Sequence, residues 1–203
     1  MILRVINRRD PLRSDVETHI RRIFAAQHGA IIYEFPERLA AAIGPDLSPL
    51  CAAGIRTAED GFFSEYYLHA PVECVLARAC RAPVQRGQVI EVTSLASDRP
   101  GHVFALLEYI TQLGRAYGQS WGVFTATEKI RRCLERAGLA FTTLATAMSD
   151  AVPNPGDWGD YYEANPAVCA IHDRRELPVS FQPPRNSPIP FSGQPTMEAK
   201  PID

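Results

Sequence analysis

The sequence predicts an α/β fold in which a mixed central sheet is flanked by helices. Two observations support this class. Residues 89–147 read in order as strand, Pro-Gly turn, helix, strand, helix and strand. Within them, residues 121–125 form a nearly continuous apolar run, which is typical of a strand covered on both faces. Strands and helices that alternate in this way belong to one layered domain.

The bulk composition limits the classes of protein to be considered. The 203 residues are 46% hydrophobic and carry a net charge of −2, which argues against a dedicated nucleic-acid binder. No apolar run approaches the roughly 18 residues of a membrane span, and residues 1–4 lack the hydrophobic segment of a signal peptide. The five cysteines are odd in number and include no C-x-x-C pair. We therefore expect a cytoplasmic protein with reduced cysteines, no nucleic-acid partner and no stable membrane insertion.

The first elements are a strand and a long helix. Residues 3–6 are rich in branched apolar side chains and predict a short strand. Ser14 and Glu17 have the spacing of a capping box, which predicts that a helix begins there, and Gly29 is a typical stop. Apolar residues recur at helical spacing between them, at Val16, Ile20, Ile23 and Phe24.

The next segment predicts a hairpin followed by a helix. Residues 38–43 and 49–57 read as two strands joined by a Gly-Pro-Asp turn. Residues 62–67 could form a strand or a short helix, and their aromatic content favours the strand. Apolar residues at helical spacing then predict a helix over residues 71–81.

The C-terminal half contains the clearest alternation. Residues 90–96 predict a strand, and the amphipathic helix after it ends at Gly118. Thr127 is a candidate cap for a further helix that ends at Gly138, and residues 140–144 predict the final strand. The residues of that helix expected to face inward are Ile130, Cys133, Leu134 and Ala137.

The composition changes near residue 174. Seven of the last 30 residues are Pro, and aliphatic residues are few. Such a segment buries too little apolar surface to offset the entropy lost on ordering. We therefore expect one folded domain over residues 1–173 and an extended or disordered Pro-rich C-terminal tail over residues 174–203.

The turn after the strand at residues 90–96 is a candidate anion site. Main-chain N–H groups at a helix start have no partner within the helix and can hold a pyrophosphate. His102 lies in the first turn of that helix, where it could contact a ligand or act as a base; the alternative is a solvated surface histidine. No paired Cys and His spacing appears, so we expect no metal site.

Four further residues are candidates for catalysis or ligand binding. Glu91 lies in the middle of a strand, where a carboxylate is costly to bury unless it pairs with a cation or acts on a ligand. Arg56 lies similarly on an earlier strand, so an ion pair without chemistry is the simple alternative. Tyr161 or Tyr162 could protonate a leaving group, or both could belong to an aromatic lid packed on the sheet.

Residues 118–122 match the G-x-S-x-G pattern of serine hydrolases. That nucleophile elbow requires a strand before the serine and a helix after it. Here a helix precedes and a strand follows, so we interpret the segment as a helix-to-strand loop.

Several of these segments together resemble the thermostable hemolysin family, whose proteins have a GNAT-like (Gcn5-related N-acetyltransferase) fold. The resemblance covers about four-fifths of the chain in the same order. The segments that carry it are Asp10-Pro11-Leu12-Arg13, His28-Gly29-Ala30, Phe35-Pro36, Ala53-Gly54-Ile55-Arg56, Ser64-Glu65-Tyr66-Tyr67-Leu68, Pro71-Val72-Glu73, Val89-Ile90-Glu91-Val92-Thr93-Ser94-Leu95-Ala96, Val123-Phe124-Thr125-Ala126-Thr127 and Trp158-Gly159-Asp160-Tyr161-Tyr162.

The resemblance implies a site for an acyl donor, either acyl-CoA or acyl carrier protein, with no covalently bound cofactor. The donor's pyrophosphate would lie at the helix start after the fourth strand. The loop at residues 99–104 keeps only part of the usual Q/R-x-x-G-x-G/A pattern, which argues against acetyl-CoA itself. The donor-binding residues implied are Ser97, Arg99, Gly101, His102, Phe124 and Thr125.

The strand around Glu91 is also similar to the Glu-x-Ser-Arg-Phe strand of acyl-homoserine-lactone synthases. On this resemblance Glu91 and Arg56 match functional residues, while Ser94 stands where those enzymes have a second arginine. That difference argues against recognition of S-adenosylmethionine. We take Arg56, Glu65 and Ser94 as candidates for binding the acceptor.

The leading functional hypothesis is acyl or aminoacyl transfer from a thioester carrier to a small amine. Glu91 would orient or deprotonate the amine, and Tyr161 or Tyr162 would protonate the leaving group. A main-chain amide of residues 121–125 would polarise the thioester carbonyl. The alternatives are a membrane-active, toxin-like protein and a non-catalytic small-molecule binder. The oligomeric state, including a homodimer, is left open.

Overall fold

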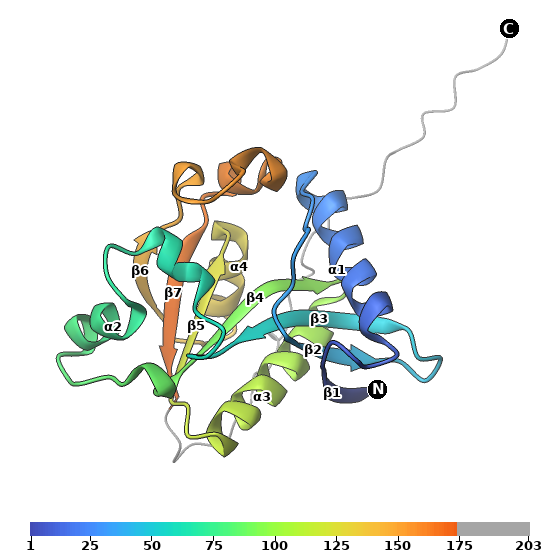
Figure 1. Cartoon of the computed structure of the whole chain (residues 1–203), viewed down its shortest axis with the longest axis horizontal. Coiled ribbons are helices and arrows are strands. Elements are labelled where there is room, and N and C mark those ends of the chain that lie inside the picture. Colours follow the sequence, from blue (N-terminus) through green and yellow to red (C-terminus); the bar gives the residue numbers. More distant parts are fainter. Residues whose placement is uncertain (174–203) are drawn as a thin grey trace, which may run out of the picture.

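Seven strands form one sheet in the order β1-β2-β3-β4-β5-β7-β6 in the computed structural model, which describes residues 1–173 (Figure 1). The sheet is mixed, because β4 and β5 run parallel while the other neighbours are antiparallel. The predicted α/β class is confirmed, and the Pro-rich tail lies outside the described residues. The strands are β1 (Ile2–Ile6), β2 (Arg38–Ile43), β3 (Pro49–Arg56), β4 (Val89–Ser97), β5 (Trp121–Ala126), β6 (Thr142–Thr146) and β7 (Ala167–His172).

Helices cover both faces of the sheet (Figure 1). Successive residues of a strand point to opposite faces, so β2 places Leu39 and Ala41 in one core and Ala40 and Ala42 in another. Helix α1 packs over the first core and α3 over the second. The helices are α1 (Arg13–His28), α2 (Val72–Cys80), α3 (Pro100–Ala116) and α4 (Glu128–Arg136), with 3-10 helices η1 (Phe63–Tyr67), η2 (Arg86–Gln88), η3 (Ser149–Ala151), η4 (Pro155–Trp158) and η5 (Tyr161–Ala164).

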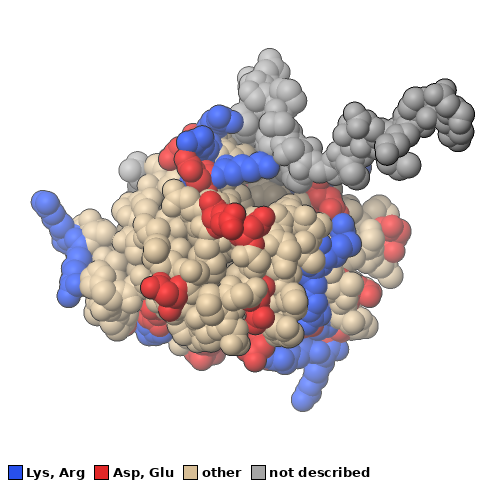
Figure 2. Space-filling view, turned by 90° about the horizontal axis from the view of Figure 1, so that it is seen from above, with Lys and Arg blue, Asp and Glu red and all other residues tan. Residues whose placement is uncertain are grey.

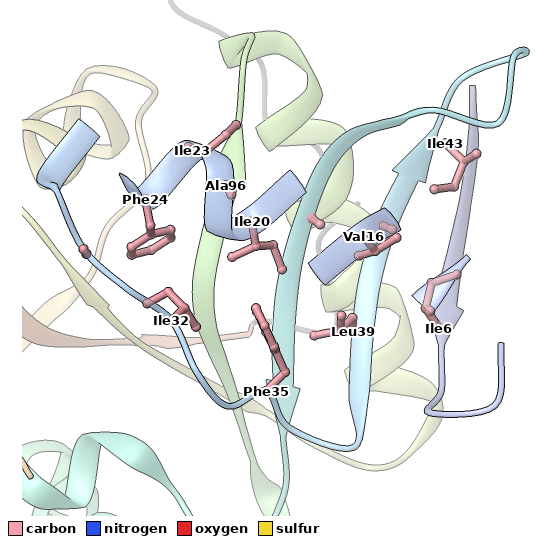
Figure 3. Packing of buried hydrophobic residues seen from close by; sticks show 13 residues of the cluster. Ile6, Val16, Ile20, Ile23, Phe24, Ile32, Phe35, Leu39, Ile43 and Ala96 are labelled. Atoms are coloured by element: carbon pink, nitrogen blue, oxygen red, sulfur yellow. The ribbon is translucent and has the colours of Figure 1, made fainter. Parts of the chain in front are cut away.

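The core under α1 follows the apolar spacing of that helix. Figure 3 shows Val16, Ile20 and Phe24 directed from the helix toward side chains of the sheet, among them Leu39 and Ala96. Gly29 ends the helix with a left-handed φ of 62°, as its position predicts.

The start of α1 differs from its prediction. The helix begins at Arg13, so Ser14 lies inside the first turn and does not act as the cap. No side chain caps α1, and the Asp10 Oδ1 accepts a hydrogen bond of 3.0 Å from the N–H of Leu12, the residue just before the helix. A carboxylate before the helix can satisfy an N–H group that has no partner within the helix.

Two further element predictions are wrong. Residues 63–67 form the 3-10 helix η1 instead of a strand, because the main chain there turns to donate N–H groups to Glu91. The segment at residues 142–146 is not the last strand, since β7 follows it and inserts between β5 and β6. In α4, Leu134 is buried as predicted, whereas Ile130 is exposed.

Charged side chains of both signs are present on the face of the molecule seen from above (Figure 2). Lys and Arg side chains of the described residues form no continuous patch in this view, and acidic side chains lie over its middle. Among residues 1–173, no helix combines the length and apolar character needed to cross a membrane.

Packing under α1 can be tested at Ile20, which is fully buried. Ile20→Ala removes buried methyl groups and leaves a cavity, so we expect the free energy of unfolding to fall by about 2–5 kcal/mol. Urea denaturation followed by circular dichroism measures this loss. Ile31→Ala is the control, because Ile31 is 55% exposed, and an equal loss in both variants would contradict the described packing.

Candidate active site between strands β4 and β5

The sheet opens where β4 and β5 separate. Their parallel pairing ends at Val92 and Phe124. Two residues later, Ser94 has a φ of 48°, and the register with β3 shifts in the same region. Val92 packs on the α3 side of the sheet, so regular alternation would place Leu95 on the α1 side and Ala96 on the α3 side. The structure shows the opposite, with Leu95 on the α3 side and Ala96 on the α1 side. This bulge bends β4 away from β5, as bulges commonly do.

A cavity of about 1890 Å³ occupies the opening. Its lining includes Glu91 and Tyr67 on the α1 side of the sheet and Ile110 and Phe124 on the α3 side. The cavity thus passes between the two strands. Of the candidate residues from the sequence, those lining it are Arg56, Glu65, Glu91, Ser94, Phe124, Thr125 and Tyr161.

Glu91 is the buried charge of the cavity, with 1% of its surface exposed. Its two carboxylate oxygens accept hydrogen bonds from the main-chain N–H groups of Phe63 (2.6 Å) and Ser64 (2.7 Å). Burial raises the pKa of Glu91 above its ordinary value, and the two hydrogen bonds and the positive charge of Arg56 oppose that rise. The carboxylate is thus held in place and is easier to protonate than an exposed glutamate.

Arg56 lies directly opposite Glu91 in the β3–β4 ladder. Its Nη1 donates to the Asp60 carbonyl at 3.3 Å, and its Nε is buried without a hydrogen-bond partner. Among residues 1–173, no carboxylate lies within salt-bridge distance of Arg56, and no cationic side chain lies within that distance of Glu91. The direct ion pair offered as the simple alternative is therefore not formed.

Aromatic rings form the wall of the cavity beside Glu91. Phe63 contacts Tyr66, Tyr67 and Trp158, with ring centroids 5.3, 6.0 and 5.6 Å apart. Trp158 also contacts Tyr161 at 5.5 Å. These contacts join η1 to the segment after β6, so the predicted aromatic packing of residues 158–162 is present.

The two candidate tyrosines differ in access to the cavity. Tyr161 lines it, but the Tyr161 hydroxyl points to the Thr125 carbonyl at 3.4 Å. Tyr162 does not line it, and its hydroxyl is 2.8 Å from that of Tyr67. Burial raises the pKa of all three phenols, so they remain protonated at neutral pH.

Tyr67 is the site residue that sequence reasoning missed. It lines the cavity, and the nearby negative charge of Glu91 contributes to the rise of its pKa. The segment containing it was expected to be a strand, in which Tyr67 would have had no reason to face Glu91. The adjacent aromatic residues at 66 and 67 were the only signal available in the sequence.

The predicted donor loop lies at the start of α3. The cavity lining includes Leu95 and Val103 on either side of this loop but not the predicted residues Ser97, Arg99, Gly101 and His102. The Ser97 hydroxyl donates to the Arg99 carbonyl at 2.8 Å and accepts from the Arg99 N–H at 3.2 Å. The His102 N–H donates to the Arg99 carbonyl at 3.2 Å. Ser97 therefore supports the turn itself, while Arg99 and Gly101 are exposed.

Glu65 is held in an ionic cluster. Its carboxylate accepts two hydrogen bonds from Arg86, of 2.5 and 2.9 Å, and one of 3.0 Å from the Val72 N–H. Arg86 also contacts Glu73 at 2.9 Å and lies over the Phe62 ring. These contacts lower the pKa of Glu65, with Arg86 as the main cause. Although Glu65 borders the cavity, its carboxylate fixes η1 to α2 and is not available to an acceptor.

The loop at residues 118–122 has the order expected from the sequence. Helix α3 precedes it and β5 follows, and Gly118 has a left-handed φ of 78°. The geometry of a nucleophile elbow is therefore absent from this loop. Across the described part of the chain, no three His, Cys, Asp or Glu side chains are grouped so that they could hold a metal ion.

A family model for thermostable hemolysin matches residues 6–176. The chain belongs to the thermostable hemolysin family. The resemblance seen in the sequence is thus confirmed. No curated protein matches this chain by sequence.

Solved structures with this fold include several synthases. The N-acyl amino acid synthase FeeM from uncultured soil microbes has a TM-score of 0.60 and 13% identity, over 89% of this chain and 99% of FeeM. TofI in its apo form has a TM-score of 0.58 and 13% identity, over 85% of this chain and 91% of TofI. The CoA-dependent acyl-homoserine lactone synthase BjaI, solved with SAM and isopentyl-CoA, has a TM-score of 0.56 and 13% identity, over 86% of this chain and 84% of BjaI. The predicted GNAT-like fold is confirmed.

Two segments that wall the cavity are tied together at Gly159. The Asp160 N–H donates to the His28 carbonyl at 2.9 Å, and the Ile31 N–H donates to the Asp157 carbonyl at 2.6 Å. Gly159 has a φ of 54°, and a Cβ there would lie 1.9 Å from the His28 carbonyl oxygen. Only glycine satisfies both constraints.

Gly159→Ala should therefore loosen the aromatic wall. We expect the free energy of unfolding to fall by about 2 kcal/mol or more, from backbone strain and the clash. Thermal and urea unfolding measure the loss. Gly156→Ala is the matched control, because a Cβ at Gly156 meets no atom within 4 Å. Equal stability of the two variants would contradict this account of Gly159.

Proposed function

We propose that this protein transfers an acyl group from a thioester carrier, CoA or acyl carrier protein, to a small amine. The observation that carries the proposal is the buried carboxylate of Glu91 in a cavity that passes between two separating strands. FeeM, TofI and BjaI share the fold, FeeM is an N-acyl amino acid synthase, and BjaI is an acyl-homoserine lactone synthase. These likenesses support an enzyme of the acyltransferase type.

In the proposed reaction Glu91 accepts a proton from the acceptor amine. A general base works best when its pKa lies near the working pH, and burial moves the pKa of Glu91 in that direction. The Phe63 and Ser64 N–H groups hold its oxygens through one lone pair each, so further lone pairs remain for the amine.

The amine nitrogen then attacks the thioester carbonyl carbon, and the C–S bond breaks. Beyond the Val92–Phe124 pair, the facing edges of β4 and β5 no longer pair with each other. A main-chain N–H on one of these edges would stabilise the developing oxyanion. The departing thiolate takes up a proton from the Tyr67–Tyr162 hydroxyl pair, and the proton that Glu91 received then returns to this pair, so that both groups are restored. Tyr161 would support this wall through Thr125.

The donor would enter from the α3 side. The part of the cavity on the α3 side of the sheet, here called the apolar arm, is lined by apolar side chains of α3, β5 and α4. These include Leu107, Ile110, Phe124 and Ile130. An apolar arm of this kind suits an acyl chain longer than acetyl, because burial of each methylene contributes roughly 0.8 kcal/mol. The exposed Arg99 and Gly101 at the start of α3 remain the proposed contacts for the carrier's phosphate, with His102 beside them.

The role of Glu91 predicts a specific pH dependence. The base acts only when deprotonated, so wild-type activity should rise with pH through a midpoint above the ordinary pKa range of a glutamate. Glu91→Gln should lower kcat/KM by about 100-fold to 10,000-fold and abolish this rise. Steady-state kinetics with acyl-CoA and acyl carrier protein donors measure both effects.

Full turnover by Glu91→Gln would remove Glu91 from the chemistry. Glu163→Gln is the control, because Glu163 is exposed and lies outside the cavity lining. The family name, thermostable hemolysin, suggests membrane lysis as a second function. The same pair of variants distinguishes lysis from acyl transfer. Red-cell lysis by the wild type that persists in Glu91→Gln would support a membrane-active protein.

The apolar arm predicts selectivity for the acyl chain. Leu107→Trp should narrow the arm and lower kcat/KM for a dodecanoyl thioester by about tenfold or more, while a hexanoyl thioester is affected less. Competition between the two donors, followed by mass spectrometry, measures the ratio of kcat/KM for the dodecanoyl thioester to that for the hexanoyl thioester. Ala116→Trp on the exposed side of α3 is the control. An unchanged ratio in Leu107→Trp would show that the acyl chain of the donor does not bind in this part of the cavity.

A further inference from the structure

We infer that the acceptor is an α-amino acid with an apolar or aromatic side chain, whose carboxylate is bound by Arg56. This inference rests on the proposed function and adds the chemical class of the amine. Nothing in the acyl-transfer chemistry itself requires the acceptor to carry a carboxylate. The requirement comes from the charges that border the cavity.

Arg56 is a cation with unused donors. A guanidinium has five N–H donors arranged to match a carboxylate. The one contact seen is from Nη1 to the Asp60 carbonyl at 3.3 Å, while Nε is buried without a partner. Burying an unsatisfied charged donor is costly, so the side chain is expected to gain an anionic partner when the cavity is filled.

Three carboxylates that border the cavity, those of Asp60, Glu65 and Glu91, are already engaged by other donors. Asp60 binds the Arg38 guanidinium at 2.9 Å and the Thr57 N–H at 2.8 Å. Glu65 is bound by Arg86, and Glu91 by two main-chain N–H groups. The partner that we infer for Arg56 is therefore the carboxylate of a ligand.

The position of Arg56 relative to Glu91 indicates an α-amino acid. The two residues are direct partners in the antiparallel β3–β4 ladder, so their side chains leave the same face of the sheet. Cβ atoms of such a pair are about 4.5–5.5 Å apart. An α-amino acid carries its amine and carboxylate on one carbon, so it can present the amine to Glu91 and the carboxylate to Arg56 together.

The third substituent of the acceptor would meet the aromatic wall. Phe63, Tyr66, Tyr67 and Trp158 line the cavity on the Glu91 side and contact one another through their rings. Tyr66 is 51% exposed although it is a large ring, so it is available to a ligand. Aromatic pairs add about 0.5–1.5 kcal/mol beyond the area they bury, and this favours acceptors such as phenylalanine over alanine or aspartate.

The test uses matched acceptors with the full-length protein. L-Phenylalanine and 2-phenylethylamine share ring and amine but differ in the carboxylate. With a dodecanoyl donor on CoA or acyl carrier protein, we expect kcat/KM to favour phenylalanine by about 100-fold. Arg56→Gln should reduce that ratio to near one, and Arg56→Lys should restore part of it. The ratio is compared within each variant, which cancels any effect of Arg56 on the pKa of Glu91.

Arg8→Gln is the control variant, because Arg8 is an exposed arginine outside the cavity lining and should leave the ratio unchanged. Equal use of the two acceptors by the wild type, or an unchanged ratio in Arg56→Gln, would overturn the inference and leave acyl transfer standing. Isothermal titration with L-phenylalanine alone separates the two proposals. Arg56-dependent binding without product from any donor would retain the carboxylate site and overturn the proposed function. Absence of both binding and transfer for phenylalanine would overturn the inference.

Discussion

The two hydrogen bonds from the Phe63 and Ser64 N–H groups to Glu91 are the interaction on which the site depends. A carboxylate with 1% exposure is stable only when its charge is matched by donors. Satisfying it turns residues 63–67 into η1, although their composition favours a strand. That turn brings Phe63, Tyr66 and Tyr67 to the cavity and places Glu65 against Arg86. One buried charge therefore organises both the aromatic wall and its support on α2.

The bulge at Ser94 is the second constraint. Without it, β4 would continue beside β5, and the edge groups beyond Val92 and Phe124 would pair with each other. The bulge separates the strands after Glu91, so the carboxylate lies at the mouth of the opening and not inside a closed sheet. Residues of α1, α3 and α4 supply further parts of the cavity lining. The cavity is thus a consequence of strand geometry, and the side chains determine what it can bind.

Sequence reasoning succeeded where the signal was local. The spacing of Val16, Ile20 and Phe24 predicted α1, and Gly118 and Gly29 marked helix ends with left-handed φ. It failed where a distant group competed with local preference. Ser14 lies inside the first turn of α1 and does not cap it, and Glu91 overrode the strand preference around Phe63. Strand β7 was missed because it follows a long irregular segment and pairs with β5 and β6 only in three dimensions.

The sequence by itself determined the layered α/β class and the family, and it singled out Glu91 and Arg56 as candidates, because apolar periodicity and charges placed in strands are visible without coordinates. Only the tertiary structure decided how those charges are used. Among residues 1–173 it gave Arg56 no carboxylate partner, and it engaged Glu65 with Arg86. It also revealed Tyr67 beside Glu91 and turned the hydroxyl of Tyr161 toward Thr125. Partners of this kind are distant along the chain, and their distances depend on strand register and on the bulge, which no local pattern encodes.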